Sequence, residues 1–221
     1  LSKEQLPKLK DLKLINNDDC EILYRRSKKN FGYTINFLYS LQSLNDNFDY
    51  YCFADQDDIW NKDKIYKSLQ ILEGYPEKKP SLYFGRTNYY NEDCSIKIGS
   101  SLLFKRSPSF KNAIIQNMAG GNTMVFNKVA KKIIASFGDY APASHDWWSY
   151  QIISGVEGNI FYDCEPSLKY RQHKSNIIGS NNELKDKLKR IKKIFSNELK
   201  DWNDKNIICL LYTSPSPRDF T

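Results

Sequence analysis

Short segments of strand-like composition alternate with longer helical segments along most of this sequence, and this alternation restricts the fold more than any other feature. The expected elements are strands at residues 20–26, 48–54, 80–90 and 158–173 (the last divided by a turn at Pro166), helices at 30–44, 62–75 and 144–156, a hairpin at 91–99, and a glycine loop, strand and helix within 120–138. Strands alternating with helices are typical of an α/β sheet and not of a β-sandwich. We therefore expect an α/β fold.

The charge balance of the chain narrows the classes of partner. The 221 residues carry 33 Lys and Arg against 26 Asp and Glu, a formal net charge of +7. This balance favours anionic partners such as nucleotides or an anionic membrane, although a solvated lysine-rich surface is the commoner reason for it. Arginine is scarce beside lysine, which disfavours sequence-specific reading of nucleic acid. We expect no nucleic-acid partner.

The cysteines and the hydropathy indicate the compartment. Five cysteines lie far apart without a CxxC pair, so neither a zinc site nor a disulfide framework is indicated. The sequence also lacks a run of about 18 apolar residues that could span a membrane. These features favour a reduced, cytoplasmic location.

An acidic cluster follows the apolar segment at residues 48–54. Asp55, Asp57 and Asp58 lie within four positions, at the expected carboxyl end of a buried strand, where open α/β sheets bind ligands. Alternate residues of an extended segment share a face, so Asp55 and Asp57 can converge. Paired carboxylates suit Mg²⁺ or Mn²⁺, which leave coordination positions for phosphate oxygens. The cluster therefore predicts a metal–diphosphate site.

Helix capping or a calcium-binding loop would also gather acidic residues in a short segment. Asp57 or Asp58 could cap the helix expected to begin near Lys62, but a cap needs a single carboxylate. A calcium-binding EF-hand loop requires glycine at its sixth position, and counting from Asp55 that position is Trp60. Capping remains an alternative, and an EF-hand is disfavoured.

Four motifs in a fixed order give the chain a family resemblance over about residues 15–180. They are "RRSKKNFGYTINFLYSL", "FADQDDIWNKDKI", "GGNTMVFNKVAKK" and "HDWWSYQIISGVEGNIFYDCEPSLKYRQHKSNIIG". Together they resemble family 2 glycosyltransferases of the GT-A fold, especially the rhamnosyltransferase-like group. The resemblance implies a Rossmann-like mixed sheet flanked by helices. It also implies inverting transfer of a sugar from a nucleotide-diphospho-sugar to a hydroxyl acceptor.

The resemblance assigns roles to the donor side of the site. It implies that Asp57 is the main metal ligand and that Asp55 contacts the metal or the donor ribose. Arg171 and His173 are candidates for holding the diphosphate, and a basic strand end at the surface is an equally good reading of these two residues. The implied donor is a dTDP- or UDP-sugar.

The resemblance also assigns roles on the acceptor side. Asp146 is the implied general base, although an acidic residue at a helix start is also favoured by the helix dipole alone. The expected acceptor contacts, each with a structural alternative as a turn or core residue, are Gly121, Asn122, His145, Trp147 and Trp148. The implied acceptor is a glycan or a lipid-linked acceptor.

The chain departs from this family at both ends. The N-terminal nucleotide-binding β-α-β part of the family has no counterpart here, so we expect an N-terminally truncated domain over residues 1–180 with weak or absent activity alone. Residues 181–208 are expected to form a basic amphipathic segment. Within it, residues 184–202 dock on the domain or lie on an anionic membrane. The Pro/Ser-rich residues 209–221 are expected to be a non-native or disordered tail.

The sequence thus favours a bacterial glycosyltransferase of cell-surface polysaccharide synthesis, in the cytoplasm or peripheral at the inner face of the membrane. Two further classes stay open. One is a metal-dependent nucleotidyltransferase or phosphohydrolase that uses the same carboxylates. The other is a basic module without enzymatic activity.

Overall fold

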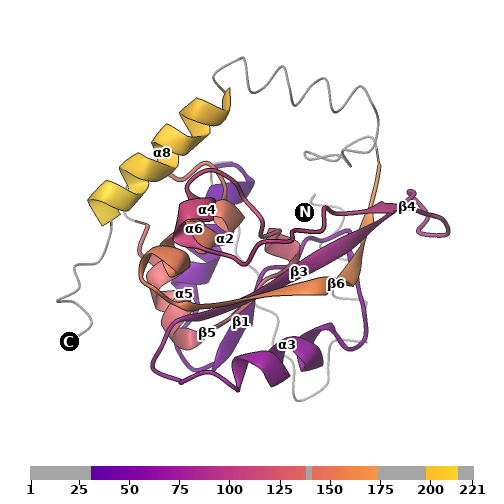
Figure 1. Ribbon diagram of the computed structural model, residues 1–221, viewed down its shortest axis with the longest axis horizontal. Helices are drawn as coiled ribbons and strands as arrows, with labels where there is room; N and C mark the ends of the chain where they lie inside the picture. The colour runs from indigo at the N-terminus through magenta and orange to yellow at the C-terminus, as the bar shows by residue number, and fades with distance from the viewer. Residues whose placement is uncertain (1–30, 138–140, 174–197, 214–221) are drawn as a thin grey trace, which may run out of the picture. The chain divides into compact units, whose positions relative to one another are not determined.

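The computed structural model describes residues 31–137, 141–173 and 198–213. It has a mixed α/β fold, as predicted (Figure 1). The strands are β1 (Tyr50–Cys52), β2 (Ile59–Trp60), β3 (Ser81–Tyr90), β4 (Lys97–Ser100), β5 (Val125–Asn127) and β6 (Asn159–Arg171). The helices are α2 (Tyr33–Ser43), α3 (Lys64–Leu72), α4 (Phe110–Ala113), α5 (Lys128–Ala135), α6 (His145–Gly155) and α8 (Glu198–Thr213), with a 3-10 turn η2 (Gly121–Thr123).

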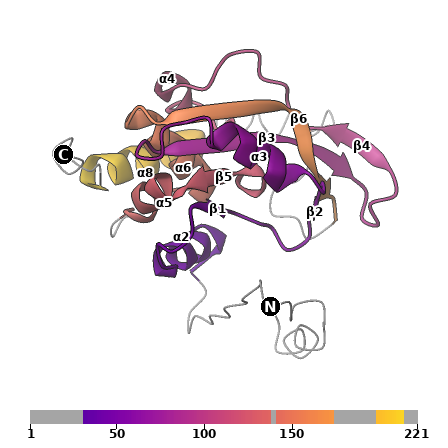
Figure 2. The same ribbon diagram turned by 90° about the horizontal axis from the view of Figure 1, so that it is seen from below.

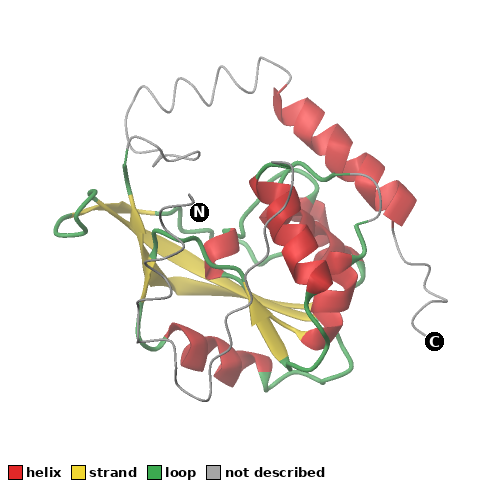
Figure 3. Ribbon diagram, turned by 180° about the vertical axis from the view of Figure 1, so that it is seen from behind, coloured by secondary structure: helices red, strands yellow, loops and turns green. Residues whose placement is uncertain are grey.

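The six strands described form one mixed sheet in the order β1-β5-β3-β6-β2, with β4 paired to β3 outside this path. The long strands β3 and β6 run parallel, and every other pair is antiparallel. Figure 3 shows the sheet between α3 on one side and a larger group of helices on the other. Both faces are therefore covered, which explains the nearly continuous apolar runs in the central strands.

The two sheet faces follow from the alternation of side chains along each strand. Tyr51, Phe126 and Leu82 occupy one row of the register and belong to the larger core, with residues of α2, α5 and α6. Tyr83 and Val125 lie on the opposite face, in a smaller cluster with Leu72 of α3. Figure 2 shows α3 and α2 at different levels relative to the sheet. Strand β1 thus contributes Tyr51 to the larger core and Tyr50 to the smaller cluster, just before the acidic residues that follow it.

Most of the predicted elements are confirmed within one to four residues, and the differences have physical reasons. Residues 159–171 form one strand, not two strands divided at Pro166. The register between β3 and β6 shifts around Arg86, opposite Pro166, and such an irregularity accommodates a residue without an N–H. The two-residue strand β2 and the single-turn helix α4 were not predicted, because elements this short depend on tertiary partners. The predicted strand at residues 20–26 lies outside the described residues.

The C-terminal helix α8 packs on the domain through polar groups. Asn206 Oδ1 accepts a hydrogen bond of 2.8 Å from the backbone N–H of Ala143, and the buried Cys209 Sγ lies 3.5 Å from the carbonyl oxygen of Phe137. The non-native or disordered tail was expected to begin at residue 209, but the helix continues to Thr213, so residues 209–213 are helical. The basic segment 184–197 lies outside the described residues. None of the helices described is both long and apolar enough to cross a membrane.

Candidate functional site

The acidic cluster begins where strand β1 leaves the sheet. Phe53, the first residue after β1, is 4% exposed and packs its ring 5.2 Å from Phe126 and 4.8 Å from the imidazole of His145. This anchor fixes the direction of the chain, so the following carboxylates of Asp55, Asp57 and Asp58 are partly buried at this end of the sheet. A strand precedes these residues, as predicted, but only its middle residue, Tyr51, is buried, because β1 lies at the edge of the sheet.

The carboxylate of Asp57 meets the residue that follows strand β6. His173 Nε2 lies 2.7 Å from Asp57 Oδ2, across 116 positions of sequence. Strand β2 pairs with β6 immediately beside this contact, with Ile59 opposite Lys169 and Trp60 opposite Leu168. Two residues that the sequence motifs assigned separately, to the metal and to the diphosphate, are therefore direct neighbours.

The carboxylate of Asp58 meets the glycine turn. Asn122 Nδ2 donates a hydrogen bond of 2.5 Å to Asp58 Oδ2. Burial raises the pKa of Asp58 to about 7, helped by the negative charges of Asp55 and Asp57 and opposed by the bond from Asn122. Asn122 was predicted as an acceptor-binding residue; its amide contacts Asp58, and the acceptor role stays a prediction. Sequence reasoning missed this bond because nothing local relates positions 58 and 122.

A fourth carboxylate joins the cluster from helix α6. Ser144 caps this helix, and Asp146 lies in its first turn, where the helix dipole favours a negative charge. Burial raises the pKa of Asp55, and the charges of Asp57 and Asp146 raise it further, so the three carboxylates lie within electrostatic reach of one another. The structure thus brings the predicted metal ligands and the predicted base to the same end of the sheet.

The turn that carries Asn122 is fitted against the start of α6. A Cβ on Gly121 would lie 2.5 Å from His145 Nε2, so this position requires glycine. The imidazole of His145 is 6% exposed and stacks on Phe37, with ring centroids 4.2 Å apart. Burial lowers the pKa of His145, which keeps the ring neutral. Gly121 and His145 therefore set the position of the turn η2.

The remaining predicted residues lie in two places. Trp147 and Trp148 are 4% and 0% exposed, and their indole N–H groups donate to the carbonyl oxygens of Ala113 and Ile134. Both rings therefore fill the interior, which agrees with the alternative of a core position for these two residues. Arg171 is the last residue of β6, two positions before His173.

Helix capping does not explain the carboxylates. The N-cap residue of α3 is Asp63, and its side chain makes no capping hydrogen bond. Asp57 and Asp58 are bound instead to His173 and Asn122, which lie far away in sequence. These contacts favour the ligand-site interpretation of the cluster over the capping one.

The carboxylates at this end of the sheet can be compared with the set of ligands that the implied metal ion requires. Within the described part of the chain, no group of three or more His, Cys, Asp or Glu side chains is arranged to hold a metal ion. Mg²⁺ commonly takes only one or two protein carboxylates and completes its coordination with water and phosphate oxygens. Burial is the main reason why the pKa values of Asp55 and Asp58 are raised, and the charges of neighbouring carboxylates raise them further. The residues therefore fit a divalent cation, which stays a prediction.

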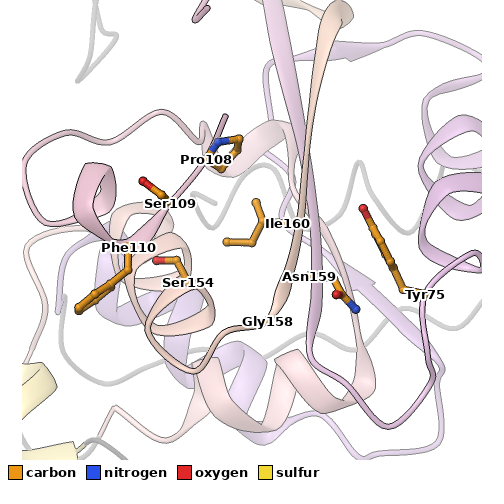
Figure 4. Close-up of a pocket in the computed structure, with 8 residues that line it drawn as sticks. All are labelled: Tyr75, Pro108, Ser109, Phe110, Ser154, Gly158, Asn159 and Ile160. Atoms are coloured by element: carbon orange, nitrogen blue, oxygen red, sulfur yellow. The ribbon is translucent and has the colours of Figure 1, made fainter. Parts of the chain in front are cut away.

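A cavity of about 310 Å³ lies at the other end of β6. Figure 4 shows Tyr75, Phe110, Ser154 and Asn159 among its lining residues. None of the residues around it carries a formal charge. The acidic cluster beyond the opposite end of the same strand is thus chemically distinct from this neutral cavity.

The comparison with curated proteins agrees with the resemblance noted in the sequence. The chain is 31% identical over 156 residues to dTDP-rhamnosyl transferase RfbG of Shigella flexneri. The match covers 66% of this chain and 50% of the relative, so the chain spans about half the length of the curated relative it matches. No protein-family model matches the chain.

Proposed function

We propose that this chain is part of a glycosyltransferase that transfers a sugar from a nucleotide-diphospho-sugar to a hydroxyl acceptor in bacterial polysaccharide synthesis. One observation carries the proposal: Asp57 with His173, Asp58 with Asn122, and Asp55 near Asp146 come from four distant segments and meet at one end of the sheet. The similarity to a dTDP-rhamnosyl transferase supports the sugar-transfer chemistry over other uses of such a cluster.

On the donor side, Asp57 and Asp55 would hold Mg²⁺ or Mn²⁺ against the diphosphate. The bound ion would neutralise the charge that develops on the nucleoside diphosphate as it leaves. His173 orients the Asp57 carboxylate through their 2.7 Å contact. Arg171, close by at the end of β6, supplies positive charge suited to phosphate oxygens.

On the acceptor side, Asp146 acts as the general base. The acceptor oxygen attacks the anomeric carbon, its proton passes to the Asp146 carboxylate, and the bond to the nucleoside diphosphate breaks with inversion. Asp146 Oδ1 accepts a hydrogen bond of 2.7 Å from the backbone N–H of Trp147, which restrains the position of the carboxylate. The neutral His145 beside it holds the turn of Gly121 and Asn122 in place.

The donor class follows the relative, whose name specifies a dTDP-linked rhamnosyl group. We propose a dTDP-sugar or UDP-sugar as donor and a glycan or lipid-linked hydroxyl as acceptor. We also propose action in the cytoplasm or at the inner face of the membrane, where such donors and lipid-linked acceptors meet.

Calorimetric titration of the 221-residue chain in Mn²⁺ tests the proposal. The dTDP- and UDP-sugars are compared with free nucleoside triphosphates, and we expect saturable binding of the sugar nucleotides that Asp57→Ala abolishes. Asp49→Ala is the matched control, because Asp49 precedes β1 and its side chain is 84% exposed. Binding of triphosphates alone would replace the proposal with a nucleotidyltransferase or phosphohydrolase. Binding unaffected by Asp57→Ala would refute the assigned site.

A further inference from the structure

Lys64 is a buried cation whose charged group lacks a hydrogen-bond partner within the described part of the chain. The residue is 1% exposed, at the start of α3, and shares the buried face of this helix with Ser68 and Leu72. Lysine is almost never fully buried unless it is paired, because removing an ammonium from water is costly. Lys64 belongs to the motif "FADQDDIWNKDKI", but neither the family resemblance nor the proposed mechanism gives this residue a role.

The ammonium of Lys64 is held against an aromatic ring that the sheet fixes. Its Nζ lies 3.4 Å from the ring centroid of Trp60, a cation–π contact. Trp60 belongs to β2 and pairs with Leu168 of β6. The backbone N–H of Lys64 donates to the carbonyl oxygen of Asn61, and the N–H of Asn61 donates to that of Ser167. The start of α3 is therefore tied to β6 close to the acidic cluster.

The titratable neighbours of Lys64 include Cys52 and two carboxylates of the cluster. Burial lowers the pKa of Lys64 to about 8, and the electrostatic effects of Cys52, Asp58 and Asp55 oppose this decrease. The Lys64 charge in turn lowers the pKa values of Asp55 and Asp58, which burial raises. The ammonium of Lys64 thus packs on the Trp60 ring and lies within electrostatic reach of Asp55 and Asp58.

We propose that Lys64 is a positioning residue, an internal counter-charge that the Trp60 ring holds beside the cluster so that a divalent cation binds with a diphosphate and not alone. This inference rests on the proposed metal–diphosphate site. A fixed positive charge beside carboxylates repels a free divalent cation but has a weaker net effect on a metal already neutralised by a diphosphate. Lys64 therefore ensures that the metal enters with the donor and leaves with the product.

Titration of the whole chain with Mn²⁺ alone, followed by electron paramagnetic resonance of the free ion, tests the inference. Lys64→Met removes the charge and keeps the length of the side chain, and we expect it to bind free Mn²⁺ at least about tenfold more tightly than the natural chain. Lys64→Arg keeps the charge and is expected to restore the natural affinity. Lys67→Met is the matched control, because Lys67 lies one turn along α3, half-exposed and paired with Asp63.

The outcomes separate this inference from the proposed function. Mn²⁺ affinity that is unchanged or weaker in folded Lys64→Met, or tightened equally by Lys67→Met, overturns the counter-charge role, as does the absence of Mn²⁺ binding in all variants. If Lys64→Met fails to fold, Lys64→Gln provides the same test. No sugar nucleotide is present, so a failure to bind donors would refute the proposed function without changing the Mn²⁺ comparison.

Discussion

Two buried lysines of this molecule have opposite surroundings. Lys131 on α5 is 5% exposed, and its Nζ donates to the carbonyl oxygen of Leu44 at 2.7 Å and to Asp46 Oδ1 at 2.8 Å. Lys64 on α3 is 1% exposed and has no such partner among the residues described. The charge of Lys131 is therefore paired within the fold, as in a structural ion pair. The charge of Lys64 lacks such a pair, which is what we expect in a region that binds a ligand.

The two regions also differ in their ratio of carboxylates to cations. Asp46 meets both Lys131 and Lys132, at 2.8 and 3.4 Å, so one carboxylate has two cations. In the acidic region, the charges of Asp57 and Asp146 act on Asp55, those of Asp55 and Asp57 act on Asp58, and Lys64 is the opposing cation for both Asp55 and Asp58. Buried or partly buried charge that is not balanced is characteristic of functional sites more than of structural ion pairs. The imbalance, not the size of a cavity, marks the site.

The largest expected effect separates the two regions by ligand affinity. Asp57→Ala removes a proposed metal ligand, so we expect the affinity for dTDP in the presence of Mn²⁺ to fall ~100-fold or more, as loss of a central charge contact does. Asp46→Ala removes a carboxylate of the balanced region and should change this affinity less than twofold. Calorimetry on both variants measures the two affinities. Equal losses of affinity would show that the two regions do not differ in ligand binding.

The second prediction concerns stability. Lys131→Met leaves the Leu44 carbonyl and Asp46 without their donor, so the free energy of unfolding should fall by about 1–3 kcal/mol. Lys64→Met replaces an unpartnered buried ammonium with an apolar chain, so the change should lie within about 1 kcal/mol or be stabilising. Urea unfolding followed by circular dichroism measures both. A larger loss for Lys64→Met than for Lys131→Met would contradict the proposed contrast.

The third prediction tests how the acidic region is assembled. Gly121→Ala places a Cβ against His145 Nε2, and relieving this contact must displace either the turn η2 or the imidazole. We expect a loss of about 1–3 kcal/mol in the free energy of unfolding and weaker binding of Mn²⁺ with dTDP. Gly74→Ala, at the end of α3, is the control, since its Cβ would be 3.3 Å from the nearest atom. Wild-type binding by Gly121→Ala would show that the turn does not support the site.

The smallest expected effect is a pH dependence in the balanced region. The hydrogen bond from Lys131 holds the pKa of Asp46 below its ordinary value of 3.8 in the folded chain. A lowered folded-state pKa stabilises the fold above pH 3.8, and this contribution disappears as the pH falls through the folded value. Asp46→Asn should therefore lower the Tm slightly at about pH 7 and leave it unchanged near about pH 2. A Tm difference that persists in the acidic sample would contradict this origin.

The sequence predicted the fold and half of the site for identifiable reasons. Apolar periodicity predicted the helices and strands, and the local order of residues predicted that Asp55 and Asp57 follow a strand. Both features depend on neighbouring residues only, and both are present in the structure. The contact between Asn122 and Asp58 spans 64 positions and depends on the packing of Gly121 against His145, which no local pattern records. Lys64 was overlooked because lysine is usually exposed, although its spacing with Ser68 and Leu72 places it on one helix face.

The central claim is that the acidic end of the sheet binds a metal ion together with a nucleoside diphosphate. Electron–nuclear double resonance of Mn²⁺ bound to the chain in the presence of dTDP tests it most directly. We predict a ³¹P coupling from directly coordinated phosphate in the natural chain and in Asp49→Ala, and its loss in Asp57→Ala. A Mn²⁺ signal without phosphorus coupling, or a coupling that survives in Asp57→Ala, would contradict the account.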